Sequence, residues 1–187
     1  LPVEILFNPP NPISQRIVIN RGSKDGLKLG NPIASDSGIL GQVIRVYDHS
    51  AEVSLLEDRD FAVPVQIARN GLRAAVFGVG RGNPLELRYL PVASDLEVGD
   101  VLITSGIDGV YPPGFAVAVI SRIERNADKN SSNVFCVPVA PANRYRQALA
   151  LLYDPQWDAK ASTANSKPDA PLTNTLGRRQ TRARGMQ

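Results

Sequence analysis

The amino-acid sequence predicts an all-β fold followed by a disordered C-terminal tail. Fifteen prolines and fifteen glycines among 187 residues are more than long helices tolerate. Short runs of β-branched and apolar residues alternate with turn signals along the first 150 or so positions. Several short strands at this spacing are typical of small barrels or of a sandwich.

The chain begins with an extended leader, residues 1–14. It contains four prolines, which remove backbone donors and bias the preceding residue away from helix. Val3, Ile5 and Phe7 alternate with other residues, which is compatible with a short edge strand.

Strand-like segments then follow closely. A strong hairpin signal, Asn70-Gly71, separates two of them. The segment Arg144–Tyr153 fits either a helix by propensity or a strand by alternation. The other predicted strands cover residues 15–20, 32–35, 39–47, 52–56, 62–68, 72–79, 85–90, 101–104, 115–123 and 134–139.

A pattern recurs within the chain. The stretch Ile17–Ile33, IVINRGSKDGLKLGNPI, has an echo in Leu87–Gly106, and a shift of 69 residues places Asn31 on Asp100. A shift of 76 residues places Val43 on Val119. Two interpretations stay open at this point: a duplicated β unit, or turn chemistry that recreates the same short pattern.

The net charge is unevenly distributed. Residues 155–187 carry six basic and two acidic side chains, so the body before them has a net charge of about −1 although the whole chain is at +3. This tail is poor in apolar residues and is predicted to be disordered. The nearly neutral body argues against a nucleic-acid-binding domain, which would present a basic face.

The sequence shows no local pattern typical of a catalytic or metal site. His49 is the only histidine, in a polar turn, and no Gly-x-Ser-x-Gly elbow accompanies it. Cys136 is the only cysteine and is expected to be a buried, inert thiol. The acidic segment 57–60 is expected to be a solvated connection, and the glycines of 78–82 a hairpin tip. We therefore expect no catalytic residue, metal or cofactor.

An ordered series of motifs resembles one family. Asn11-Pro12 precedes IVINRGSKDGLKLGNPI, and GILGQVIRV, AVPVQIARNGLRAAVFG and LEVGDVLITSGIDGVYPPGFAVAVI follow in that order. The series resembles the periplasmic part of the bacterial rod-shape-determining protein MreC, from about Asn11 to Tyr153.

The resemblance implies two small β barrels packed together. The first barrel would comprise residues 15–60 plus 120–153, with a strand at Gln147–Tyr153. The second barrel, 61–119, would be inserted into the first, and 154–187 would be the disordered basic tail.

The resemblance also implies a function. The protein would be a non-enzymatic periplasmic scaffold of the cell-elongation machinery, anchored in the inner membrane by an N-terminal helix that precedes Leu1. Its partners would be the elongation-specific peptidoglycan transpeptidase, which is a penicillin-binding protein, the membrane protein MreD, and further copies of itself. No nucleic acid is expected.

Partner binding would use exposed aromatic residues and unpaired strand edges. The candidates are Phe77, Tyr89, Tyr111 and Phe115, although each of them also suits a barrel core. Two other functions are considered: an RNA- or ribosome-associated small-barrel module, because the tail is basic, and a chymotrypsin-like double barrel that uses His49.

Overall fold

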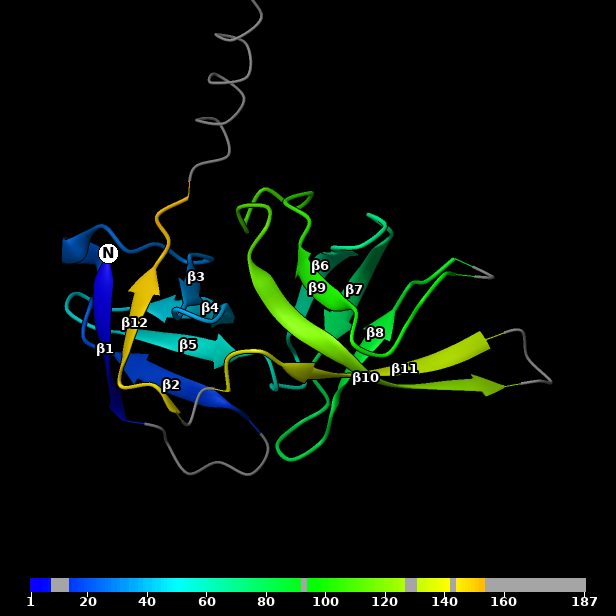
Figure 1. The fold of residues 1–187 in the computed structure, drawn as a ribbon. Coiled ribbons are helices and arrows are strands. Elements are labelled where there is room, and N and C mark those ends of the chain that lie inside the picture. The colour runs from blue at the N-terminus through cyan, green and yellow to red at the C-terminus, as the bar shows by residue number, and fades with distance from the viewer. Residues whose placement is uncertain (8–13, 92–93, 127–130, 142–143, 154–187) are drawn as a thin grey trace, which may run out of the picture. The chain divides into compact units, whose positions relative to one another are not determined.

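The computed structural model describes residues 1–7, 14–91, 94–126, 131–141 and 144–153. In this described part the regular elements are β-strands and one short 3₁₀ turn, η1 (Ser23–Asp25), so the predicted all-β fold is confirmed (Figure 1). The predicted basic tail lies outside the described residues.

The first barrel is closed by strands from both ends of the described chain. Its order is β1-β12-β3-β4-β5-β2, all antiparallel. Pro2 on β1 pairs with Leu149 on β12, and the Leu1 amino group donates to the Ala150 carbonyl at 2.9 Å. Its strands are β1 (Pro2–Phe7), β2 (Arg16–Ile19), β3 (Pro32–Ala34), β4 (Ile39–Val46), β5 (Ala51–Leu55) and β12 (Gln147–Ala150).

The second barrel is continuous in sequence and is inserted between β5 and β12. Its order is β10-β11-β8-β7-β6-β9. Its strands are β6 (Ala62–Ile67), β7 (Arg73–Phe77), β8 (Leu85–Arg88), β9 (Val101–Thr104), β10 (Ala116–Asn126) and β11 (Ser131–Pro138).

Two predicted boundaries were wrong. Residues 2–7 of the expected leader form β1 and close the first barrel. Pro2 is compatible with this strand because it stands at the start, where its missing N–H costs little. The boundary expected at Ile120 cuts through β10, which pairs along its length with β11. Both strands belong to the second barrel, and only β12 returns to the first. The strand predicted at Gln147–Tyr153 is present over Gln147–Ala150.

Each barrel has its own core, built from strand residues that alternate inward and outward. Ile17, Ile33 and Val53 are buried in the first, and Val65, Leu85 and Ile120 in the second. Each such side chain contributes about 1.5–3 kcal/mol by burial. Cys136 lies in the second core, as predicted, and burial raises the pKa of its thiol to about 12.

The two barrels have the same topology up to a circular permutation. If β12 is counted as the first strand of its barrel, then β12, β1, β2, β3, β4 and β5 connect and pair as β6, β7, β8, β9, β10 and β11 do. The sequence repeat is therefore a repeat of structure, and the strands that carry its two copies occupy equivalent places.

Hydrogen bonds refine the alignment of the two copies. The Gly30 N–H donates to the Val43 carbonyl, and the Gly99 N–H donates to the Ile120 carbonyl, at 2.8 Å in each case. Val43 and Ile120 are both buried. Val43 therefore corresponds to Ile120, and the predicted match to Val119 is wrong by one residue. The error matters because a shift of one residue exchanges the inner and outer faces of a strand.

Backbone lies against backbone where the two barrels meet. A Cβ on Gly78 would come within 1.9 Å of the Asp58 carbonyl oxygen, and one on Gly38 within 2.3 Å of the Ala116 oxygen. The connection 57–60 links the barrels, as expected, but the solvated connection that was predicted is wrong at one residue. Asp58 is buried, and its carboxylate accepts from the backbone N–H groups of Gln15 and Asp60.

Candidate partner-binding surface

Two of the four predicted binding residues come together on the outside of the second barrel. Phe77 on β7 and Tyr89, just after β8, make an edge-to-face contact with ring centroids 5.6 Å apart. Tyr89 is 78% exposed and has a φ of 63°. A positive φ is uncommon for a residue with a side chain, so the backbone of Tyr89 is held in a sparsely populated conformation.

An arginine, Arg88, lies over the Phe77 ring. Leu85 and Leu87 of β8 face the core, so Glu86 and Arg88 face outward. The Arg88 guanidinium lies 4.7 Å from the centre of the Phe77 ring, and its Nε donates to Glu86 Oε2 at 2.9 Å. A cation over an aromatic face contributes about 0.5–1 kcal/mol at an exposed site.

The arrangement is repeated on the neighbouring strands. Glu86 pairs with Phe77 on one side and with Phe135 of β11 on the other, so a row crosses β7, β8 and β11 (Figure 1). Arg122 of β10 lies 4.5 Å above the Phe135 ring, and its Nε is 3.1 Å from Glu124 Oε1. We call the surface formed by Phe77, Glu86, Arg88, Tyr89, Arg122 and Phe135 the aromatic–arginine patch.

The other two predicted binding residues do not lie on this patch. Tyr111 is buried at 1% exposure in the second core, so it cannot reach a partner in this structure. Desolvation raises the pKa of its phenol above the ordinary range, and its hydroxyl has no hydrogen-bond partner among the described residues. Phe115 is half-buried against the same core.

Sequence reasoning missed Arg88, Arg122 and Phe135. Phe135 stands between Val134 and Cys136, both buried, so strict alternation would have placed it outside. The two arginines carry no such signal, because stacking on a ring across a strand pair depends on the register.

The remaining polar candidates do not assemble chemistry. His49 is exposed, and its Nε2 lies 3.4 Å from the Lys24 ammonium nitrogen. Within the described ranges, no group of three His, Cys, Asp or Glu side chains could hold a metal ion. The same residues contain no helix that is long and apolar enough to cross a bilayer.

In the described part of the molecule, two closed six-strand barrels each enclose a packed core, and the aromatic–arginine patch lies on the outside of the second. Comparison with known proteins specifies the kind of protein. A model of the rod shape-determining protein MreC family, described as its barrel core, matches residues 5–151. This chain belongs to the MreC family, a family of structural, shape-determining proteins.

The relatives extend well beyond the matched region. The cell shape-determining protein MreC of Escherichia coli is 35% identical over 162 residues, which are 87% of this chain and 43% of that protein. The Haemophilus influenzae protein of the same name is 34% identical over 168 residues, or 90% and 46%. The chain thus spans less than half the length of these relatives.

Solved structures show the same fold. MreC from Pseudomonas aeruginosa is 39% identical and has a TM-score of 0.77, and the match covers 81% of this chain and 98% of that one. A complex of penicillin-binding protein PBP2 with MreC from Helicobacter pylori has a TM-score of 0.63 at 16% identity, over 79% and 93%. At that identity the likeness concerns the fold alone.

Proposed function

We propose that this chain is a non-enzymatic, periplasmic scaffold module of the cell-elongation machinery that binds the elongation-specific transpeptidase, a penicillin-binding protein. Family membership and the Helicobacter pylori complex support the choice of partner. The aromatic–arginine patch carries the assignment of the surface.

The patch has the composition of a binding hot spot. Aromatic residues and arginine are enriched among the side chains that contribute most to protein–protein affinity. Tyr89 and Arg122 are exposed. The Phe77 ring already contacts the Tyr89 ring, and the Phe135 ring already contacts the Arg122 guanidinium, so both exposed side chains are held in place. Such preorganised side chains lose little conformational entropy when a partner binds.

Affinity measurements on surface variants test this proposal. The chain would be immobilised and titrated with the periplasmic region of the elongation-specific penicillin-binding protein from the same organism. We expect Tyr89→Ala and Arg122→Ala each to weaken binding by about tenfold or more, as truncated hot spots do. Tyr47→Ala is the matched control, since Tyr47 is an exposed aromatic residue of the first barrel.

Each outcome has a distinct meaning. Lack of binding by the unaltered chain would contradict the partner assignment. Unchanged affinity in both patch variants, with circular dichroism showing intact folding, would exclude the patch while leaving the partner in place. Weaker binding by Tyr47→Ala alone would move the interface to the first barrel.

The remaining partners and the location belong to the same proposal. We infer self-association and binding to MreD, and a membrane anchor that precedes Leu1 in the longer protein. Sedimentation of the protein with its preceding segment would show dimers or larger species, and co-purification from detergent would show MreD. A purely monomeric protein that leaves MreD behind would contradict these inferences.

The comparisons give no support to the RNA- or ribosome-associated alternative. The described body is nearly neutral in charge, whereas RNA binding depends on a basic surface.

A further inference from the structure

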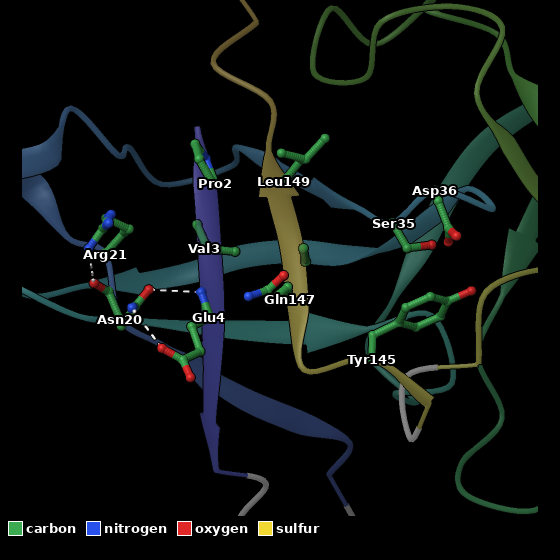
Figure 2. Close-up of a pocket in the computed structure, with 11 residues that line it drawn as sticks. Pro2, Val3, Glu4, Asn20, Arg21, Ser35, Asp36, Tyr145, Gln147 and Leu149 are labelled. Atoms are coloured by element: carbon green, nitrogen blue, oxygen red, sulfur yellow. Dashed lines mark hydrogen bonds between the residues drawn. The ribbon is translucent and has the colours of Figure 1, made fainter.

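A hollow on the first barrel has no role in the function proposed above. It has a volume of about 520 Å³, within the range of pockets that hold ligands. It lies over β1 and β12 and beside the turn between β3 and β4 (Figure 2). The polar residues that line it are Glu4, Asn20, Arg21, Ser35, Asp36, Tyr145 and Gln147.

Comparison with the second barrel shows why the hollow exists. There the pairing of β6 with β9 continues past the strand end, since the Ser105 N–H donates to the Pro64 carbonyl at 3.2 Å. The equivalent residues of the first barrel are Asp36 and Gln147, and no backbone hydrogen bond joins these two described residues. The ladder between β12 and β3 therefore ends early, and the two segments separate.

The separation leaves the backbone of Gln147 directed into the gap. Leu1 and Ala150 exchange both of their hydrogen bonds, and the Ile5 N–H donates to the Arg146 carbonyl. Because bonded and non-bonded pairs alternate in an antiparallel ladder, the Glu4–Gln147 pair is non-bonded. The N–H and C=O groups of Gln147 thus point away from β1, toward Asp36.

Two carboxylates with little compensation line the hollow: Glu4 on β1, beside Asn20, and Asp36 in the turn between β3 and β4 (Figure 2). The Glu4 carboxylate accepts from the Asn20 side-chain amide over 3.5 Å, and the Asp36 carboxylate accepts from the adjacent Ser37 hydroxyl. Arg21, the one arginine in the lining, donates to the Asn20 carbonyl at 3.1 Å and lies 3.8 Å from Asp25, so it leaves the lining with one more acid than base. The hollow thus combines main-chain donors and acceptors with an excess of negative charge.

We propose that this hollow binds a short extended segment of a partner protein that presents a lysine or an arginine. The segment aligns with the exposed backbone of Gln147, as strands do when they add to a sheet. Its basic side chain lies beside Asp36, the carboxylate on the side of the hollow formed by the turn between β3 and β4. Charge complementarity selects this occupant over an acidic or a neutral one.

Titration with matched peptides tests the proposal. The probes are acetyl-Val-Lys-Val-amide and acetyl-Val-Glu-Val-amide, and the readout is the change in backbone amide chemical shifts of the chain. We expect the lysine peptide to shift the resonances of the pocket residues and to bind about tenfold more tightly than the glutamate peptide. Asp36→Asn should remove most of that difference, and Asp48→Asn, an exposed acid outside the pocket, should leave it unchanged.

Two substitutions at one position test the main-chain contact. Gln147→Pro reproduces Pro64 of the second barrel and removes the N–H donor, so it should abolish binding. Gln147→Ala keeps the backbone and should retain binding, which separates loss of the donor from loss of the side chain. Equal binding of both peptides would overturn the proposal. So would shifts confined to residues outside the pocket, or the lack of any response to the lysine peptide.

Discussion

The two barrels share one type of turn, before β3 and before β9, but different side-chain contacts stabilise it in each. In the first, Asn31 accepts from the Lys28 N–H through its side-chain oxygen at 2.7 Å. In the second, Asp100 accepts from the Glu97 N–H at 2.9 Å in the same way. Asp100 is also bound by Arg69, whose Nε and Nη2 donate to the two carboxylate oxygens at 2.8 and 3.0 Å. Among the described residues, no cation contacts the Asn31 side chain in this way.

The difference shows how a buried turn residue can be neutral or charged. An amide satisfies the turn by itself, whereas a buried carboxylate needs a compensating cation. Hydrogen bonds from Arg69 hold the pKa of Asp100 and that of Asp95 below the ordinary range for aspartate. The salt bridge also ties the loop before β9 to the hairpin between β6 and β7, and the described residues of the first barrel show no equivalent ion pair.

The largest expected loss of stability comes from giving a position of the first barrel the residue that the second barrel has at the equivalent position. Gly41 corresponds to Ala118, which is fully buried, but a Cβ on Gly41 would lie 2.0 Å from the Ser54 carbonyl oxygen. We expect Gly41→Ala to lower the free energy of unfolding by about 3 kcal/mol, because backbone must move. Urea denaturation would measure it. The reverse change, Ala118→Gly, should cost about 1 kcal/mol, and equal losses would contradict the asymmetry.

The next effect exchanges the two turn residues. Asp100→Asn leaves Arg69 with a weaker acceptor, and we expect a loss of about 2 kcal/mol in the free energy of unfolding. Asn31→Asp introduces a carboxylate at a position of 9% exposure without an arginine, and should destabilise the first barrel to a similar extent. Hydrogen exchange would show which barrel opens. Protection lost from the wrong barrel in either variant would refute the comparison.

The same ion pair predicts a pH dependence. The folded-state pKa of Asp100 is lowered, so its contribution is fully present above the unfolded value of about 3.9. It is lost as the pH falls through the folded-state pKa. The stability difference between the native chain and Asp100→Asn should thus be constant from about pH 7 to 5 and should shrink below about pH 4. A difference that persists at pH 2–3 would show that the carboxylate charge is not responsible.

The smallest effect concerns what the turns share. Gly30 and Gly99 have φ values of 89° and 97°, which a residue with a Cβ enters at a cost. The space beside both glycines is open or in ordinary contact, so the cost is conformational. Gly30→Ala and Gly99→Ala should each lose about 1 kcal/mol in thermal or urea unfolding. A threefold difference between the two would mean that the turns are not equivalent.

The sequence predicts the fold class and the repeated unit because both depend on local patterns. Alternation and glycine turns indicate strands, and the linked motifs indicate two barrels. The pairing of β1 with β12 joins residues at the two ends of the described chain, and no local pattern specifies it. The equivalent strands β4 and β10 share a register shift, between Val43 and Arg45 and between Ile120 and Arg122, so this bulge is part of the repeat. The one-residue error arises because Val43-Ile44 and Val119-Ile120 are identical dipeptides, which a sequence match superposes.

The candidate surface was predictable only in part. Tyr89 follows a strand and is exposed, whereas Tyr111, in a loop rich in proline and glycine, folds back into the second core. Composition alone cannot separate the two tyrosines, because the distinction depends on how a long loop packs. Stacking of Arg88 and Arg122 on phenylalanine rings depends on cross-strand register, which sequence patterns specify only weakly.

The closure of the first barrel by β1 and β12 has a mechanical consequence. Leu1 and Ala150 form a bonded pair, so the two strands leave the barrel at the same end of their ladder. A force that pulls the chain apart at these two points acts in an unzipping geometry, in which one pair of hydrogen bonds is loaded at a time. It reaches the Val3–Ala148 pair only after the Leu1–Ala150 pair has broken. The inserted second barrel carries none of this load until the first has opened. The first barrel is thus the element that yields under tension, and the barrel that bears the aromatic–arginine patch is mechanically shielded by it.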